Sequence, residues 1–131
     1  MEAQQLLDEL GKHLGFALSL NEHGLCRVLF QEDAVDFEED EGSLWLVAEV
    51  GPVPAGGREG IFGEMLAANA FGLGTKEAVL GMDAAKDAIF LHRHCPSGMD
   101  YPDFEHVLVD FVLVLREWKS RLRDHVLLAD D

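Results

Sequence analysis

Residues 100–122 carry the longest apolar pattern of the chain and constrain the fold more than any other segment. Eight of the nine residues from Val107 to Leu115 are apolar, and only Asp110 interrupts them. So much apolar surface must be covered by other elements of the chain, by a second copy or by a guest polypeptide. We expect the sheet and the first helix to cover it. The residues at steps of three and four, which form one face of a helix, are Phe104, Leu108, Phe111, Leu115, Trp118 and Leu122.

The rest of the chain predicts two further helices and a series of short strands. Steps of three and four indicate helices, alternation indicates strands, and glycine or proline marks the turns. Consecutive strands are joined by short turns, so we expect antiparallel pairing. The predicted helices are residues 3–15, 59–71 and 100–122, the last with Asp100 as N-cap. The predicted strands are 16–20 and 25–30 as a hairpin, 32–41 as a short acidic edge strand, 43–50, 77–83 and 87–92.

The expected fold class is therefore α+β. We predict a curved antiparallel β-sheet of about five or six strands, packed by three helices in the order α-β-β-β-α-β-β-α. The length of 131 residues suits a single domain over residues 1–131, with one hydrophobic core.

The charge of the chain excludes several classes of partner. There are 25 acidic against 10 basic residues, which gives a net charge of −15. That charge repels phosphates and anionic membranes, so we expect neither nucleic acid binding nor membrane insertion. The N-terminus lacks the basic region and apolar core of a signal peptide. With only Cys26 and Cys95, a disulfide framework is not expected either, and a cytoplasmic location is predicted.

The chain shows no convincing catalytic or metal-binding motif. His92, His94 and Cys95 could contribute metal ligands, but their spacing matches none of the usual structural-zinc patterns. A nucleophilic pair of Cys95 with His94 or His106 lacks the glycine-flanked turn that such sites use. The acidic run lacks the spacing of a calcium loop, and no phosphate-binding motif occurs. We therefore predict no enzyme, no cofactor and no metal site, with a metal-binding protein that uses His92 and His94 as an alternative.

Four segments in succession suggest a family. LLDELGKHLG runs into LSLNEHGLCRVLF, LWLVAEVG follows the acidic run, EMLAANAFGLGTKEAVLGMD joins a helix to a strand, and DFEHVLVDFVLVLREW closes the pattern. This succession resembles the Tir chaperone (CesT-like) family of type III secretion chaperones. The resemblance implies a small acidic homodimer without enzymatic activity. It would bind the N-terminal region of a secreted effector in extended form and keep it soluble and export-competent.

Further partners and one rival function follow from the same resemblance. The ATPase of the secretion apparatus is a further partner to consider. A regulatory or adaptor module with the same fold, but without an exported guest, is the alternative function. An extended guest can bind by adding a strand to a sheet edge, and the charge of −15 favours guests with basic segments.

Two candidate surfaces follow from the apolar faces and from the family's arrangement. Each aliphatic side chain in them could instead belong to the core of one monomer. Asn69, a polar residue on an apolar helix face, could bridge a dimer or bind backbone groups within one subunit. The candidate effector-binding residues, on the first helix and the neighbouring sheet, are Leu6, Leu10, Leu14, Leu18, Val28 and Phe30. The candidate dimer residues, on the second helix and the strand after it, are Met65, Leu66, Asn69, Phe71, Leu80 and Met82.

Overall fold

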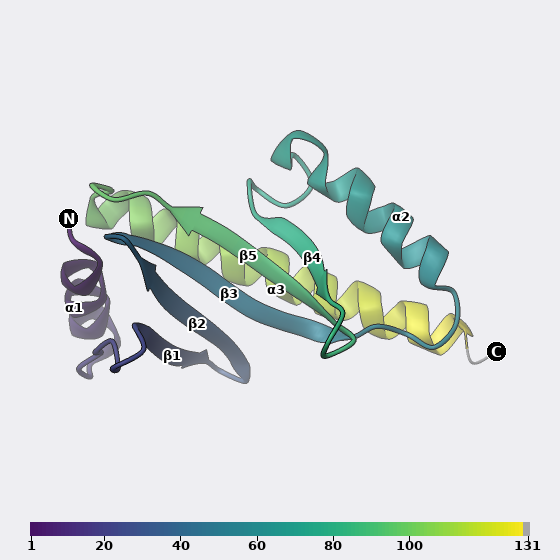
Figure 1. Cartoon of the computed structure of the whole chain (residues 1–131), viewed down its shortest axis with the longest axis horizontal. Coiled ribbons are helices and arrows are strands. Elements are labelled where there is room, and N and C mark those ends of the chain that lie inside the picture. Colours follow the sequence, from purple (N-terminus) through teal and green to yellow (C-terminus); the bar gives the residue numbers. More distant parts are fainter. Residues whose placement is uncertain (130–131) are drawn as a thin grey trace.

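The computed structural model describes residues 1–129, and the side chains of residues 1–126. Within them the chain forms three α-helices and one five-stranded antiparallel sheet (Figure 1). The predicted fold class and element order are confirmed. The elements are α1 (Ala3–Leu14), β1 (Leu25–Phe30), β2 (Asp33–Asp40), β3 (Ser43–Pro52), α2 (Arg58–Asn69), the 3₁₀ turn η1 (Ala70–Gly72), β4 (Val79–Asp83), β5 (Ala88–Cys95) and α3 (Tyr101–Ala129).

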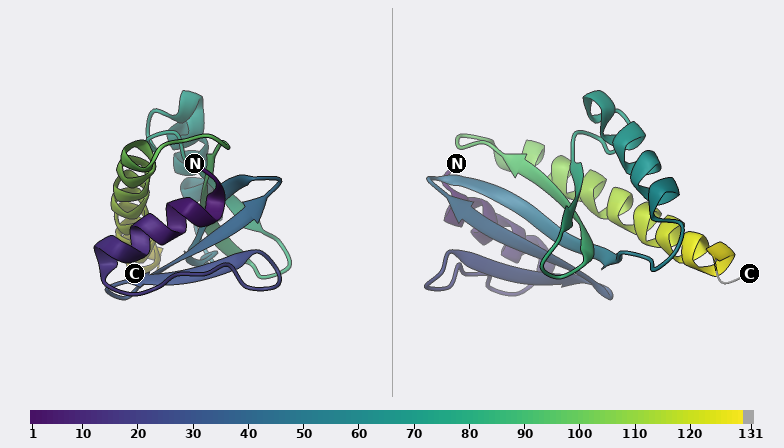
Figure 2. Two further views of the ribbon diagram at one scale, coloured as in Figure 1. Left: turned by 90° about the vertical axis from the view of Figure 1, so that its left-hand side faces the viewer. Right: turned by 45° about the vertical axis from the view of Figure 1, so that its right-hand side comes forward.

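The sheet has one covered and one open face. Its strand order is β1-β2-β3-β5-β4, so β3 lies at the centre and β1 and β4 form the two edges. Helices α1 and α3 lie against one face, and α2 lies beside β4 (Figures 1 and 2). Alternate residues of each strand enter the core beneath α3, as in β3, while their neighbours point to the open face. The buried residues of β3 are Leu44, Leu46, Ala48 and Val50.

Helix α3 supplies much of the core. All six residues of its predicted apolar face are buried, and Asp100 accepts a hydrogen bond from the N–H of Asp103 at 3.0 Å, as an N-cap does. The helix continues beyond residue 122 because no glycine or proline stops it before Ala129. No helix within residues 1–129 has the length and apolar content that a membrane crossing requires.

The prediction that the sheet and α1 cover the whole apolar surface of α3 is wrong for two residues. Val109 and Leu113 are each about half exposed, at 52% and 53%. Helix α1 packs near the start of α3, where the ring of His13 stacks on that of Tyr101 with centroids 4.9 Å apart. The outer side of the middle of α3 therefore has no cover within the described part of the chain.

The predicted hairpin of residues 16–20 with 25–30 is also wrong. Residues 16–20 form no strand, and the side chain of Gln4 binds them instead. Its amide donates to the carbonyl of Leu18 at 3.0 Å, and its oxygen accepts from the N–H of Leu20 at 3.1 Å. A Cβ at Gly11 would lie 2.5 Å from the carbonyl oxygen of Phe16, so the chain doubles back closely against α1. The helix, and not a strand, is the partner of this segment.

The acidic strand is not an edge strand. Strand β2 pairs with β1 on one side and with β3 on the other. Its alternation places Val35 and Phe37 in the core, and Asp33 is also buried. Because the hairpin partner of β1 is β2 and not residues 16–20, the edge of the sheet passes to β1.

Candidate partner-binding surfaces

An apolar patch lies where α2, η1 and β4 meet, and it contains all six candidate dimer residues. Five of them, together with Phe62, line a pocket of about 270 Å³. Met65 and Leu80 are buried in its floor, whereas Leu66 is 74% exposed and Met82 is 47% exposed. The sixth, Phe71, is 96% exposed. The residues that line the pocket are Phe62, Met65, Leu66, Asn69, Leu80 and Met82.

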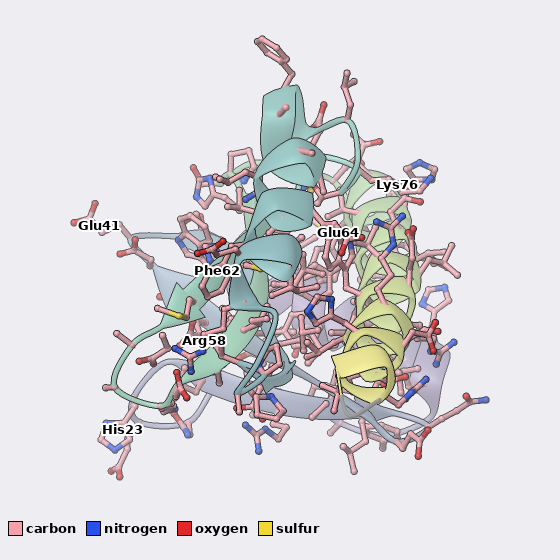
Figure 3. The ribbon with its side chains drawn as sticks, turned by 90° about the vertical axis from the view of Figure 1, so that its right-hand side faces the viewer. His23, Glu41, Arg58, Phe62, Glu64 and Lys76 are labelled. Carbon is pink, nitrogen blue, oxygen red and sulfur yellow. The ribbon has the colours of Figure 1, made fainter. Side chains whose placement is uncertain are left out.

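The turn after α2 holds Phe71 away from the body of the protein. Phe71 has φ of +55°, a left-handed conformation that ordinary residues rarely adopt. The following chain folds back tightly, since a Cβ at Gly74 would lie 2.8 Å from the Cα of Ala68. Figure 3 shows Phe62 and Glu64 on opposite sides of α2, with Glu64 toward α3. There it lies 3.9 Å from Arg121, so this ion pair and the patch belong to different sides of the helix.

Asn69 binds backbone groups of its own subunit. Its Nδ2 donates to the carbonyl of Leu80, and its Oδ1 accepts from the N–H of Leu80, both at 2.8 Å. Thr75 binds the next outward-facing residue in the same way: its carbonyl accepts from the N–H of Ala78, and its hydroxyl donates to the carbonyl of Ala78. Asn69 and Thr75 therefore bind the outward-facing backbone groups of Leu80 and Ala78, whereas those of Met82, the next such residue of β4, have no backbone partner within the described residues.

The outer edge of β1 leaves more backbone groups free than that of β4. The N–H and carbonyl of Leu25 face outward, where both bind Asn21 at 3.0 and 2.8 Å. Backbone groups of alternate residues in a strand face the same way, so those of Arg27 and Leu29 also face outward. They have no backbone partner in the part of the chain that the structure describes. Leu29 is 64% exposed, so an apolar side chain lies beside these free groups.

The candidate effector-binding residues divide into two groups. The core of the monomer contains most of them, and the two that reach the surface are Leu14, which is exposed, and Phe30, which is half-buried. Phe16 and Leu29 are also exposed, although neither is among the residues predicted from the sequence. Leu29 points to the opposite side of β1 from buried Val28, which the alternation could have indicated, whereas Phe16 shares the alternation of buried Leu18 and has no such signal. The buried members are Leu6, Leu10, Leu18 and Val28.

A wider cleft of about 840 Å³ lies between the start of β2, the end of β3 and the last turns of α3. At its wall the buried carboxylate of Asp33 binds Arg116 Nε at 2.8 Å and Lys119 Nζ at 2.7 Å. Burial alone would raise the pKa of Asp33, but hydrogen bonds from Lys119 and Arg116 outweigh it and hold that pKa below its usual value. These ion pairs tie α3 to β2, and no local pattern in the sequence predicts them.

The histidine and cysteine cluster does not come together. His92 and His94 lie on the open face of the sheet, beside Trp45. Cys95 is buried on the other face, and burial raises the pKa of its thiol to about 11, which disfavours the thiolate that a nucleophile needs. His106 lies on α3, 3.5 Å from Asp110. Among the described residues, no three His, Cys, Asp or Glu side chains are grouped so that they could hold a metal ion.

Comparison with known proteins agrees with this architecture. The family model of the Tir chaperone protein (CesT) family matches residues 5–119. No curated protein matches the chain. Among solved structures, a chain of the ExsC–ExsE complex is similar, with 22% identity, 93% of this chain and 97% of that chain covered, and a TM-score of 0.77.

Two further structures are similar over nearly the whole chain. The HopA1–SchA chaperone–effector complex contains a chain with 17% identity, which covers 89% of this chain and 92% of that chain, with a TM-score of 0.74. The ExoU–SpcU complex from the type III secretion system of Pseudomonas aeruginosa contains one with 26% identity, which covers 97% of both chains, with a TM-score of 0.70. The family match spans most of the sequence, and the chain belongs to the Tir chaperone protein (CesT) family.

Proposed function

We propose that this protein is a cytoplasmic type III secretion chaperone that binds a secreted effector in extended form at the outer edge of β1. The observation that carries this proposal is the difference between the two sheet edges. Asn69 and Thr75 bind the outward backbone groups of Leu80 and Ala78 and leave those of Met82 on β4, whereas the main-chain groups of both Arg27 and Leu29 on β1 are free. Family membership supports it, as do similar chains in complexes described as chaperone–effector or from type III secretion.

Strand addition explains how such a site would keep a guest soluble. An added strand pairs its own backbone groups with β1 and can place alternate side chains against exposed apolar residues. Leu29 and Phe30 are available on β1, and Leu14 and Phe16 at the end of α1. This exchange of contacts requires no nucleotide, and the guest leaves without having formed a folded core.

Co-expression with the neighbouring reading frame, followed by affinity purification, tests the function. We expect one specific partner to become soluble and to co-purify. An adaptor module without an exported guest would leave that partner insoluble or unbound, and this result would contradict the chaperone function.

A substitution at Leu29 tests the binding edge. The N–H of Leu29 makes no hydrogen bond within the sheet. Leu29→Pro therefore removes only the hydrogen bond that this N–H would donate to the guest. We expect Leu29→Pro to lose the effector in a pull-down, while Leu29→Thr, which keeps the N–H, retains it. Circular dichroism checks that both variants fold. If Leu29→Pro binds the effector as well as the parent, strand addition at β1 is wrong, although the chaperone function can stand.

We further propose that two copies associate through the patch of α2, η1 and β4. The patch combines a projecting apolar side chain, Phe71, with an apolar pocket in the same surface. In a two-fold dimer each copy meets the same surface of the other, so Phe71 of one copy can enter the pocket of its partner. Since Leu80 already satisfies the polar atoms of Asn69, burying this pocket leaves no amide without a partner.

Light scattering on the purified protein tests the dimer. We expect a dimer for the parent chain and a monomer for Leu66→Glu, because the charge would lie in an apolar interface. Met65 is a poorer choice, since it is buried and its replacement would also damage the fold. Leu113→Glu is the control, because it places the same charge on an exposed leucine of α3. A dimeric Leu66→Glu variant would move the interface to another surface.

A further inference from the structure

The open face of the sheet has an aromatic centre. Glu38, Trp45 and His94 are directly opposite one another on β2, β3 and β5. The ring of His94 lies 4.6 Å from that of Trp45, centroid to centroid, and the ring of His92 lies 6.2 Å from it. Trp45 is only half-buried, although a tryptophan has a large apolar surface that favours burial. Part of a π-system is therefore exposed on this face.

A glycine on β4 makes room for this arrangement. A Cβ at Gly81 would lie 3.3 Å from His92 Nε2, so the imidazole lies closely over the backbone of β4. Burial lowers the pKa of His92, and the charge of Glu38 opposes this shift only in part. His92 is thus neutral at pH 7, and it neither repels a cation on this face nor neutralises the carboxylate.

The same face carries the carboxylates of Asp36, Glu38 and Glu49 against two cations, Arg27 and Lys86, and Lys86 Nζ lies 5.7 Å from the ring centroid of Phe90. Asp36 is bound to Arg27, with Nε to Oδ1 at 2.6 Å. Glu38 and Glu49 also point to this face, and neither makes an ion pair among the side chains of residues 1–126. A free carboxylate and a half-buried indole thus lie directly opposite one another on β2 and β3. A guanidinium group fits both, because it stacks on aromatic rings and also donates to carboxylates.

We propose that this open face binds an arginine-bearing extended segment of the guest polypeptide, with the guanidinium against Trp45 and paired with Glu38. This inference rests on the proposed function for the identity of the guest. A second copy of the chain does not fit this face, since it would bring further negative charge against unpaired carboxylates. The site would retain a basic part of the guest that the β1 edge does not hold.

Two short peptides test the site on the full chain. In the first peptide, arginine alternates with threonine, and in the second peptide, lysine takes the place of arginine. Binding of each peptide is followed by fluorescence anisotropy. We expect the arginine peptide to bind about fivefold more tightly, because lysine has no planar group to stack. Glu38→Gln should weaken its binding about threefold to fivefold. Glu59→Gln, which removes the same charge from an exposed position on α2, is the control and should have a smaller effect.

A second readout does not depend on folded variants. The chain has two tryptophans, and Trp118, a residue of α3, is buried in the core. On titration with the arginine peptide, the indole N–H resonance of Trp45 should move and that of Trp118 should not, with Trp45→Phe for assignment. Equal binding of the two peptides, equal effects of Glu38→Gln and Glu59→Gln, or an unchanged Trp45 resonance would overturn the proposal. None of these results bears on co-purification of the effector through β1.

Discussion

Asp33 is the clearest case of one residue that joins distant parts of the chain. Its carboxylate binds Arg116 and Lys119, which are more than eighty positions away. Asp33→Asn removes the charge that both cations face, and they are only partly exposed. We expect the free energy of unfolding to fall by about 2 kcal/mol at pH 7, between the values for exposed and buried pairs. Urea denaturation at a fixed protein concentration measures this loss.

The pH dependence of the same variant identifies the cause. The two cations hold the pKa of Asp33 in the folded chain below its value in the unfolded chain. The contribution of Asp33 is therefore complete above about pH 4 and is lost as the pH falls through the lower, folded pKa. The difference between parent and variant should be constant from pH 5 to 7 and should shrink below pH 4. A difference that does not shrink at all between pH 5 and pH 3 would assign the loss to packing.

Polar side chains that bind backbone groups could not be found from the sequence. Gln4, Asn69 and Thr75 each replace a missing strand partner, but nothing in their local sequence distinguishes them from solvent-exposed residues. The sequence is compatible with two roles for Asn69, and in the structure its side chain binds the backbone of Leu80 within one subunit. Such roles depend on which backbone groups remain free after the sheet has formed.

At the scale of elements, two leucines of α3 separate core packing from surface exposure. Leu115 is fully buried, and Leu113, two positions earlier, is half exposed. We expect Leu115→Ala to lower the free energy of unfolding by about 3 kcal/mol, because it leaves a cavity against the sheet. Leu113→Ala, the matched control, should change it by no more than about 0.5 kcal/mol. Urea titrations at one protein concentration compare them, and equal losses would contradict this orientation of α3.

The elements that the sequence predicted correctly are those with a long regular pattern. Helix α3 has six apolar residues in one face, and β3 alternates over its whole length, so tertiary contacts reinforce the local signal. Residues 16–20 also alternate, but only Leu18 enters the core. Five residues are too few to distinguish a strand from an extended segment packed on a helix. Because residues 16–20 were predicted to be the partner strand of β1, the sequence did not predict that β1 lies at the edge of the sheet.

The surfaces of the whole molecule differ in character. One face of the sheet holds the core, the β4 side carries the apolar patch, and the backbone groups of Arg27 and Leu29 on the β1 edge have no backbone partner within the described residues. Five of the six candidate dimer residues line one pocket because α2 and β4 are adjacent, and their role in a dimer stays a prediction. The candidate effector-binding residues do not all reach the surface, because an apolar helix face that packs a core resembles in sequence one that binds a guest.

The net charge of the chain predicts how the proposed dimer responds to salt. Two chains of −15 repel one another, whereas the proposed interface is uncharged. Salt screens this repulsion, since the Debye length falls from about 30 Å at 0.01 M to about 8 Å at 0.15 M. Sedimentation equilibrium should therefore show a dimer dissociation constant that decreases several-fold over this range, while binding of a basic guest weakens. A dimer that dissociates with added salt would instead be held by ion pairs, and the apolar patch could not be its main contact.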